Sequence, residues 1–360
     1  MNIPNGICIA ALCCLLGCGG GSSPDPGSNG NGNGNGNGNG NQPPAGTQVS
    51  NSRLRSVTDW VYWIQDPDLT ALAAGDSQLV VIDYSQDGTQ DTAFSPAQIS
   101  ALQAGGRLVV CYLSIGEAED YRFYWGLQDG SPGADWDSNP PAWLGPTNPD
   151  WAGNYKVRYW DPGWQQLIIA NPGGHPVLGD APSYLDRIID AGFDGVFLDI
   201  VDGFEYWGPA EDGGIGQRAQ AASDMADFLA ALAAHARSRD ADFIICQQNG
   251  EALISDELAQ PLDSSRRQAV LSAVDWLSVE DVFYQGELDA NNPLDPDNYR
   301  IGLIDAYRNA GEFVSIIDYF DAAEPGYSAA AEADFLNRSK ARGWLPYAGV
   351  RALDRLGSGG

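Results

Sequence analysis

The chain has 360 residues, of which 43% are hydrophobic, and its 19 lysines and arginines against 48 aspartates and glutamates give a net charge of −29. Phosphate contacts need clustered lysine and arginine, so this balance excludes a general nucleic-acid-binding protein. The 11 Trp, 15 Tyr and 11 Phe exclude a wholly disordered chain, and the length allows one large domain or two ordinary ones.

The first residues are typical of an export signal. The apolar run over residues 7–16 has the length of the hydrophobic region of a signal peptide and is too short to span a membrane. Residues 15–18, Leu-Leu-Gly-Cys, resemble the lipobox of bacterial lipoproteins, although residues 1–10 contain no Lys or Arg. We therefore predict a signal peptide over residues 1–17 and lipidation of Cys18, with an ordinary cleaved signal as the alternative. Either reading predicts an exported protein, a cell-envelope lipoprotein or a secreted one, that meets a membrane only through its N-terminal lipid.

A low-complexity segment follows. Residues 19–47 are almost wholly Gly, Asn, Ser and Pro, with Asn-Gly alternation over 29–41. This composition predicts a flexible tether over residues 18–49, with a root-mean-square span on the order of 30 Å. Only Cys111 and Cys246 lie beyond the first 18 residues, which excludes a disulfide framework. One exported domain over residues 50–360 remains.

From residue 59 onward the sequence repeats one pattern: an amphipathic helix, a glycine or polar break, a short apolar run, and a loop that begins with acidic, amide or aromatic residues. One helix start is clear, with Ser95 as N-cap, Pro96 at the first helical position and Gln98 three residues after the cap. Most of the apolar runs lack polar residues, as parallel strands buried on both faces require. The predicted strands are 60–64, 79–82, 108–113, 196–198, 243–246, 276–279, 313–317 and 345–350.

Eight such units predict a single-domain α/β protein, the (β/α)₈ or TIM barrel. A doubly wound open sheet is the alternative, but no Gly-x-Gly-x-x-Gly follows the first strand and there is no P-loop. The stretch between the third and fourth strands, 114–195, is long and rich in Trp, Gly and Pro. We expect this aromatic-rich insertion to cover or shape a site.

Barrel enzymes hold their catalytic groups at the C-terminal ends of the strands, and these ends are rich in acids here. They carry Asp83, Glu117, Glu119, Asp199, Asp202, Asn249, Glu251, Glu280, Asp281 and Asp318. The two histidines, His175 in a loop and His235 on a helix, provide neither a zinc cluster nor a Ser-His-Asp triad. We predict neither a metal nor a cofactor.

Chemistry that uses two carboxylates without histidine or metal is above all glycoside hydrolysis, in which one acid protonates the leaving oxygen and the other attacks the anomeric carbon or activates water. Aromatic residues near the strand ends could stack on sugar rings, or could simply pack the loops onto the barrel. They are Tyr84, Tyr112, Tyr121, Tyr124, Trp125, Trp160, Tyr206, Trp207, Tyr284 and Tyr319.

Several sequence phrases carry a family resemblance. They are Val-Cys-Tyr-Leu-Ser-Ile-Gly-Glu-Ala-Glu-Asp-Tyr-Arg over 110–122, Tyr-Trp-Asp over 159–161, Gly-Phe-Asp-Gly-Val-Phe-Leu-Asp over 192–199 and Val-Glu-Asp over 279–281. Residues 60–353 resemble the endo-α-1,4-polygalactosaminidases, glycoside hydrolase family 114, and related glycoside hydrolases of TIM-barrel fold. The resemblance implies cleavage of α-1,4-linked galactosamine polymers by an Asp after the fourth strand and a Glu after the sixth. Here these residues are Asp199 and Glu280.

Glu251 is an alternative to Glu280. Glu280 directly follows the run 276–279, so a strand would fix its Cα, whereas Glu251 lies in the loop beyond Asn249 and could begin a helix. We predict retaining hydrolysis with Asp199 as nucleophile and Glu280 as acid/base. The residues expected to bind substrate are Asp83, Tyr84, Tyr112, Glu117, Glu119, Arg122, Trp160, Asp202, Asn249, Glu251, Tyr284 and Asp318. For Glu117 the alternative is a salt bridge to Arg122 that only orders the loop.

The expected partner is a polysaccharide, cationic where it carries free galactosamine, and the sequence specifies no oligomeric state. A charge of −29 would concentrate a cationic polymer at the barrel. Adaptation to high salt is an alternative cause of the acidity. Two rival functions remain: a surface barrel that binds polysaccharide without cleaving it, as a lectin does, and a glycosidase that acts on a different α-linked glycan.

Overall fold

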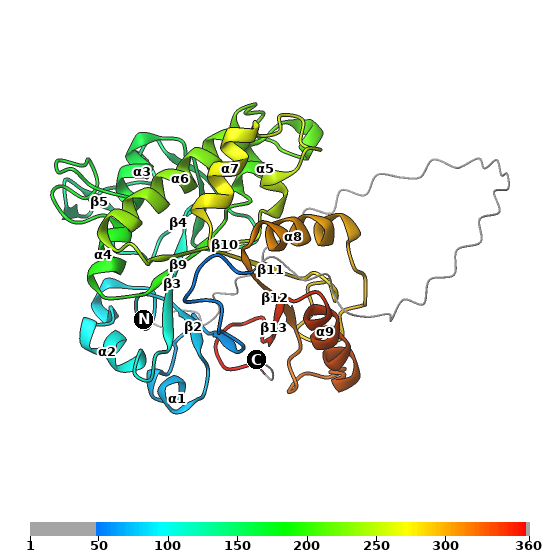
Figure 1. The fold of residues 1–360 in the computed structure, drawn as a ribbon. Coiled ribbons are helices and arrows are strands. Elements are labelled where there is room, and N and C mark those ends of the chain that lie inside the picture. Colours follow the sequence, from blue (N-terminus) through cyan, green and yellow to red (C-terminus); the bar gives the residue numbers. More distant parts are fainter. Residues whose placement is uncertain (1–47, 358–360) are drawn as a thin grey trace, which may run out of the picture.

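The computed structural model of the protein describes residues 48–357, and its centre is one curved sheet of eight parallel strands (Figure 1). The strands are β1 (Trp60–Tyr62), β2 (Leu79–Ile82), β3 (Leu108–Ser114), β9 (Gly195–Asp199), β10 (Ile244–Gln248), β11 (Trp276–Glu280), β12 (Phe313–Tyr319) and β13 (Leu345–Gly349). They lie side by side in chain order, and each neighbouring pair is parallel. The first and last strands, β1 and β13, also lie in contact, and the rings of Trp60 and Tyr347 on them pack with their centroids 5.4 Å apart. This arrangement confirms the predicted TIM barrel.

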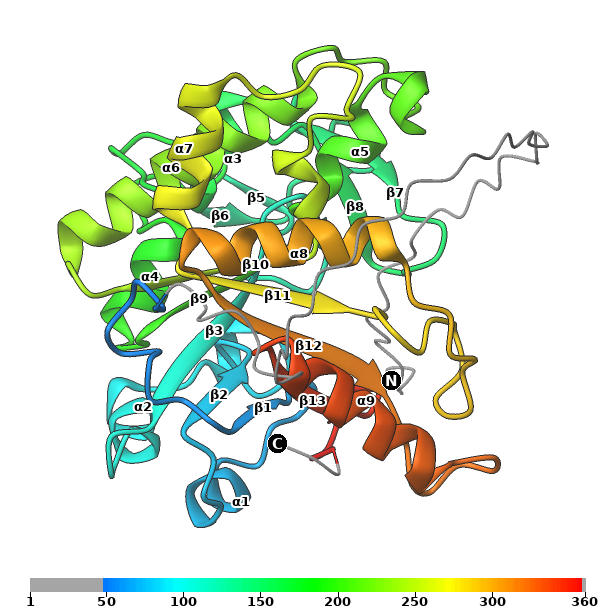
Figure 2. The ribbon, with the colours of Figure 1, turned by 45° about the vertical axis from the view of Figure 1, so that its right-hand side comes forward.

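A helix follows each of the first seven strands before the next one begins. The outer helices are α1 (Leu69–Ala74), α2 (Pro96–Leu102), α4 (Tyr184–Asp190), α6 (Ala221–Arg239), α7 (Ser264–Ala273), α8 (Asn298–Ala310) and α9 (Ala329–Ala341). The predicted start of α2 is confirmed, because Ser95 and Gln98 form a capping box with Pro96 in the first turn. Figure 2 shows α8 lying across β11 and α9 beside β12 and β13, on the outer face of the sheet. In the described residues no helix is long and apolar enough to cross a membrane.

Aromatic rings fill the inside of the barrel. Trp60 on β1 contacts Trp276 on β11 with ring centroids 5.3 Å apart, and Phe197 on β9 contacts Trp276 at 5.4 Å and Tyr62 at 4.9 Å. Rings from strands that are not neighbours can meet only in the interior, so the barrel is a packed core rather than a pore. Within this core the indole N–H of Trp276 donates to Ser315 Oγ at 2.8 Å, whereas the buried indole N–H of Trp60 has no hydrogen-bond partner.

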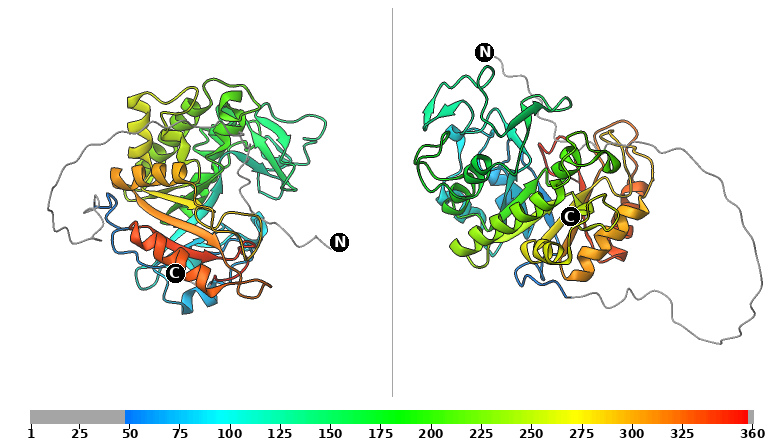
Figure 3. Two further views of the ribbon diagram at one scale, coloured as in Figure 1. Left: turned by 90° about the vertical axis from the view of Figure 1, so that its right-hand side faces the viewer. Right: turned by 90° about the horizontal axis from the view of Figure 1, so that it is seen from above.

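The segment between β3 and β9 builds a small structure of its own beside the barrel. It contains a three-stranded antiparallel sheet in the order β4 (Glu117–Glu119), β8 (Asn154–Val157), β7 (Leu144–Thr147), a hairpin of β5 (Leu127–Gln128) and β6 (Ser131–Pro132), and the short helix α3 (Pro162–Ile168). These strands project at one side of the barrel in Figure 3 (right). Since β4 follows the C-terminal end of β3, the small sheet stands at the mouth of the barrel.

Tryptophans hold this segment together. The ring of Trp136 packs against Trp125 at 4.7 Å and against Trp143 at 5.4 Å, and Trp143 packs against Trp164 at 4.8 Å. Of the aromatic residues named as possible sugar platforms, Trp125 therefore packs within this segment. The predicted signal peptide and the lipidation at Cys18 lie outside the described residues. The two cysteines within them, Cys111 and Cys246, are free and buried.

Candidate active site

Asp199 and Glu280 close two strands that are separated by one other. Asp199 is the last residue of β9, Glu280 is the last residue of β11, and β10 lies between them. Neighbouring strands lie about 4.8 Å apart, so the two Cα atoms are about 10 Å apart along the sheet, and its curvature turns inward-facing side chains toward each other. Both residues are buried, and the charges of both add to the burial that raises the pKa of Tyr62. The two carboxyl groups therefore face the same space above the aromatic core.

Asp199 receives two hydrogen bonds. The hydroxyl of Tyr112 on β3 donates to Oδ2 at 2.7 Å, and the backbone N–H of Ile200 donates to Oδ1 at 2.9 Å. Burial raises the pKa of Asp199 well above its ordinary value, and the charges of Asp202 and Glu280 add to the rise. The bonds from Tyr112 and Ile200 oppose it, because they stabilise the ionised form.

Glu280 is oriented by three side chains from the strands on either side of it. Gln248 and Asn249, at the end of β10, donate to Oε1 at 3.0 and 2.9 Å, and the hydroxyl of Tyr319 on β12 donates to Oε2. The backbone N–H of Glu280 donates in turn to Asn249 Oδ1 at 3.1 Å. This carboxylate therefore has a fixed orientation at the mouth of the barrel.

Glu251, the alternative to Glu280, lies in a different environment. It begins a short 3₁₀ helix, Glu251–Ile254, and forms a buried salt bridge with Arg300 at 2.5 Å. Arg300 also donates to the backbone carbonyl oxygens of Glu280 at 3.2 Å and Asp281 at 3.0 Å. The carboxylate of Glu251 thus helps to hold the end of β11, and the geometry favours Glu280 for chemistry.

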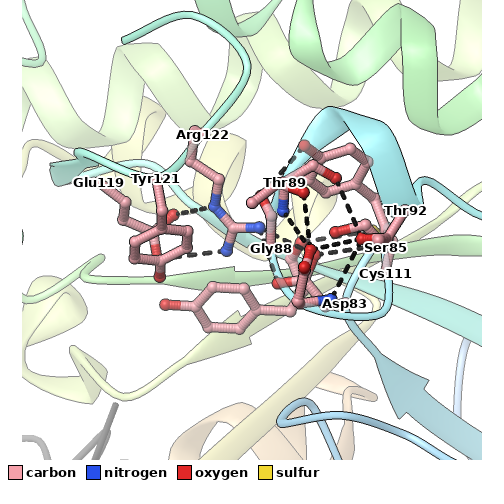
Figure 4. Close-up of polar contacts among 12 residues, drawn as sticks. Asp83, Ser85, Gly88, Thr89, Thr92, Cys111, Glu119, Tyr121 and Arg122 are labelled. Carbon is pink, nitrogen blue, oxygen red and sulfur yellow. Dashed lines mark hydrogen bonds and ion pairs between the residues drawn. The ribbon is translucent and has the colours of Figure 1, made fainter. Parts of the chain in front are cut away.

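A buried charge cluster joins the loops that follow β2 and β3 (Figure 4). The guanidinium of Arg122 lies between two carboxylates, with Nη1 2.8 Å from Asp83 and Nε 2.6 Å from Glu119, and Tyr121 donates its hydroxyl to Glu119. Four tyrosine rings surround the guanidinium at 4.8 to 5.9 Å: Tyr84, Tyr112, Tyr121 and Tyr184. Because these charges pair with one another, the arrangement supports a role in positioning loops rather than in contacting substrate.

Glu117 faces the mouth from the small sheet and is fully buried. It accepts hydrogen bonds from Asn148 at 2.9 Å and Asn154 at 3.0 Å, and it forms a salt bridge with Lys156 at 2.5 Å. The alternative of a salt bridge to Arg122 is wrong, because Arg122 pairs with Asp83 and Glu119. Lys156 takes that place since β4 and β8 pair with Glu117 directly opposite it.

Asp318 holds the chain that follows β11. It is fully buried, and its carboxylate accepts N–H bonds from Val282, Phe283 and Tyr284 at 2.9, 3.1 and 2.8 Å. Burial raises the pKa of Asp318 to about 7, and these backbone bonds oppose the rise. The hydroxyl of Tyr284 donates to Asp334 on α9. The polar groups of Asp318 and Tyr284 are thus engaged in contacts within the protein.

The remaining residues that were predicted to bind substrate differ in their exposure to solvent. Asp202, just beyond β9, is half-buried and does not cap the helix that it precedes, α5 (Gly203–Trp207). Burial raises its pKa to about 6, and the ammonium of Lys156 opposes the rise. Trp160 is also half-buried, but the guanidinium of Arg218 covers its ring at 4.2 Å. Tyr84 is buried and donates its hydroxyl to the Gly88 carbonyl at 3.1 Å.

Three contacts in the site were not predicted. Lys156 pairs with Glu117, Gln248 donates to Glu280, and the backbone of Ile200 donates to Asp199. Of these residues, only Gln248 could have been identified from the sequence, because it lies just beyond a predicted strand. Over residues 48–357 no group of three or more His, Cys, Asp or Glu side chains is placed to hold a metal ion.

Two buried, hydrogen-bonded carboxylates at the C-terminal mouth of a TIM barrel are the arrangement expected of a glycoside hydrolase. The sequence profile of the glycoside-hydrolase family GH114 matches residues 41–358, and the chain belongs to this family. The family resemblance of the sequence phrases is thereby confirmed.

The chain is also similar to other proteins and to a solved structure. An uncharacterized protein of Methanocaldococcus jannaschii is 38% identical over 302 residues, which are 82% of this chain and 77% of that protein. An uncharacterized protein of Deinococcus radiodurans is 35% identical over 292 residues, 80% of this chain and 78% of the other. The glycoside hydrolase domain of PelA from Pseudomonas aeruginosa has the same fold, with a TM-score of 0.56 and 18% identity over 84% of this chain and 98% of that domain.

Proposed function

We propose that this glycoside hydrolase cleaves an α-1,4-linked, galactosamine-type polysaccharide by a retaining mechanism, with Asp199 as nucleophile and Glu280 as acid/base. One observation carries the choice of residues: the two carboxyl groups end β9 and β11, face the same space and are each oriented by a tyrosine hydroxyl. The polymer and its linkage follow from the sequence resemblance.

In this mechanism Glu280 protonates the glycosidic oxygen while Asp199 attacks the anomeric carbon, and the C–O bond to the leaving sugar breaks. Water then attacks the glycosyl–enzyme ester, and Glu280 accepts its proton, which regenerates both groups. Asn249, Gln248 and Tyr319 fix the orientation of Glu280 throughout. Carboxyl groups about 5 to 5.5 Å apart in the substrate complex fit retention, whereas about 6.5 to 9.5 Å fits inversion.

A cationic glycan suits the charge of the mouth. Asp202 is half-buried close to Glu117, Glu251 and Glu280, whose charges raise its pKa. Lys156 is the ammonium that opposes this rise, and it already forms a salt bridge with Glu117. Asp202 is therefore the acid best placed to meet the ammonium of a galactosamine unit.

The test is direct. The purified protein is incubated with α- and β-linked hexosamine polymers, acetylated and partly deacetylated, and new oligosaccharides are identified by mass spectrometry. We expect galactosamine oligomers from the wild type and none from Asp199→Asn or Glu280→Gln. Glu312→Gln is the matched control, because Glu312 is a buried acid just before β12, at the other end of the barrel. Tight binding without products from any polymer would support a lectin-like barrel, and products from another α-glycan alone would change the substrate.

We also propose that the enzyme is exported and lipidated at Cys18. The support is the apolar run 7–16, the Leu-Leu-Gly-Cys phrase and the tether of residues 18–49. In cells, the wild type is expected in the membrane fraction and Cys18→Ala in the soluble exported fraction. Equal partitioning of the two proteins would favour the ordinary cleaved signal.

A further inference from the structure

The residue that follows Asp199 has an unusual backbone. Ile200 has φ of +58°, in the left-handed region. Asn249 and Asp281, which follow β10 and β11, also have positive φ, at +54° and +52°. Asn and Asp tolerate this conformation because their short polar side chains bond locally, but a β-branched residue does not. Something must therefore hold Ile200 in place, and the strain is concentrated beside a candidate catalytic group.

Gly116 provides the space that this conformation needs. A Cβ added to Gly116 would lie 2.2 Å from the carbonyl oxygen of Ile200, 2.5 Å from its Cγ2 and 2.9 Å from its Cβ. The φ of Gly116 is outside the left-handed region, so a side chain is excluded by the close approach and not by the backbone angle. Gly116 belongs to the Ser-Ile-Gly-Glu-Ala-Glu phrase and directly precedes Glu117.

The neighbouring backbone is anchored on both sides. The N–H of Ile115 donates to the carbonyl oxygen of Asp199 at 3.0 Å, and the carbonyl oxygen of Gly116 accepts from the N–H of Val157 at 3.1 Å. The indole of Trp164 donates to the carbonyl oxygen of Ile115 at 2.8 Å. Residues 115 and 116 are thus fixed between the small sheet and the end of β9, and they lie in close contact with the peptide that follows Asp199.

We propose that Gly116 is a positioning residue: by lacking a side chain it admits Ile200 in the left-handed conformation, which aims the N–H of Ile200 at the carboxylate of Asp199. This role rests on the proposed function of Asp199 as nucleophile. The bond from Ile200 to Oδ1 and the bond from Tyr112 to Oδ2 together fix both carboxylate oxygens.

Loss of the Ile200 bond has a predictable electrostatic consequence. The ionisable groups that face Asp199 are Tyr62 on β1, Tyr112 on β3, Asp202 beyond β9 and Glu280 on β11. Asp202 and Glu280 disfavour a second negative charge, so only hydrogen-bond donors favour ionisation of Asp199. If the N–H of Ile200 is displaced, Tyr112 remains as the donor, and the acid form of Asp199 persists to higher pH.

The experiment compares Gly116→Ala with Gly203→Ala. A Cβ on Gly203 would lie 3.5 Å from Ile200 Cγ2, an ordinary van der Waals contact with the same residue. We expect Gly116→Ala to lower kcat on the order of 10- to 100-fold with little change in KM, and to move the acid limb of the rate profile to higher pH. Gly203→Ala keeps the wild-type profile. An unmoved acid limb in folded Gly116→Ala overturns the proposal, even where Asp199→Asn is inactive and the proposed function stands.

Two further comparisons keep the test decisive. If Gly116→Ala does not fold, Ile200→Gly is compared with the double variant Ile200→Gly/Gly116→Ala, because the first removes two of the three clashing atoms and glycine adopts the same φ freely. The acid limb is expected to move in the double variant alone, and equal profiles overturn the proposal.

If the wild type cleaves no polymer, the proposed function fails, and ¹³Cγ-aspartate NMR titration tests the role of Gly116 instead. The Asp199 signal, identified by its loss in Asp199→Asn, should titrate at higher pH in Gly116→Ala, and an unchanged titration overturns the proposal.

Discussion

Two tyrosine hydroxyls donate to the carboxylates of the proposed catalytic pair. Tyr112 donates to Asp199 and Tyr319 donates to Glu280, and both tyrosines are almost fully buried. A hydrogen bond from a neutral donor stabilises a carboxylate more than a carboxylic acid, so the hydroxyl of Tyr112 lowers the pKa of Asp199. This lowering opposes the rise caused by burial, and the proposed role of Asp199 as nucleophile requires its ionised form.

Tyr112→Phe is therefore expected to raise the pKa of Asp199 further, because it removes one donor while keeping the ring against Arg122. Activity then needs a higher pH, and the acid limb of the kcat/KM profile moves upward. A pH–rate profile measures the shift. Tyr159→Phe is the control, since this buried hydroxyl donates to the backbone carbonyl of Ala221 and to no carboxylate. An acid limb that moves equally in both variants, or in neither, would contradict the assigned role of Tyr112.

Glu280→Gln and Glu251→Gln should separate catalysis from stability. Glutamine at position 280 can still accept from Gln248 and Asn249, so the fold is kept while the proton donor is lost. At position 251 the change breaks a buried salt bridge with Arg300, which costs about 3–5 kcal/mol of the free energy of unfolding. Urea unfolding and kcat, measured on the same preparations, should therefore rank the two variants in opposite order. Full activity in Glu280→Gln would indicate that Glu251, and not Glu280, is the acid/base.

At the scale of elements, one cluster joins the segments that follow β2 and β3. Asp83 follows β2, Glu119 ends β4, and Arg122 lies between them with almost no exposed surface. Burial raises the pKa of Asp83, and the charge of Arg122 opposes the rise. Without the guanidinium, two buried carboxylates would be left unpaired, which is the costly way to break a buried ion pair.

Arg122→Met is expected to lower the free energy of unfolding by about 3–5 kcal/mol near neutral pH. The loss should shrink on acidification, because an unpaired Asp83 has its folded-state pKa raised and its protonated form no longer carries the penalty. Urea unfolding at several pH values measures both effects. Arg266→Met is the control: its pairs with Asp227 and Asp263 are exposed, and their loss should cost less than about 1 kcal/mol. A similar loss for both arginines would contradict the structural role of the cluster.

The barrel strands were predictable because they are short apolar runs bounded by glycine or polar residues. The sequence predicted Leu79–Ile82 with its observed ends, and it stopped β12 two residues early, at 317, because Asp318 and Tyr319 interrupt the apolar run. The small sheet could not be found in the same way. Its strand Asn154–Val157 is largely polar, and its pairing with β4 joins residues more than thirty positions apart.

The same distinction holds for the site. Strand ends identify which residues reach the mouth of a parallel barrel, so Asp199 and Glu280 could be named among the acids there, while the family resemblance singled out these two. Partners that come from elsewhere in the chain could not, and Lys156 reaches Glu117 only through the antiparallel register of β4 and β8. Nor does the sequence show that the backbone of Ile200 is in the left-handed region, because this conformation depends on the absence of a side chain at Gly116.

For the whole molecule, the question is what a net charge of −29 does. Many of the arginines are committed to pairs with acids, as Arg351 is to Asp281 and Arg237 to Asp275. The excess acids make the field of the protein negative as a whole. Such a field would draw a cationic glycan toward the barrel, whereas a neutral glycan would gain nothing from it.

Steering and salt adaptation predict opposite responses to ionic strength. The Debye length falls from about 30 Å at 0.01 M salt to about 10 Å at 0.1 M, so attraction between the protein and a distant polycation is largely screened over this range. If the field steers the substrate, kcat/KM for a deacetylated polymer falls as salt is added, while that for the acetylated polymer stays level. If the acids are an adaptation to salt, the midpoint of urea unfolding rises with salt, and neither polymer loses kcat/KM. Equal salt responses of kcat/KM for the two polymers would therefore contradict electrostatic steering. The acidity would then serve stability and solubility instead.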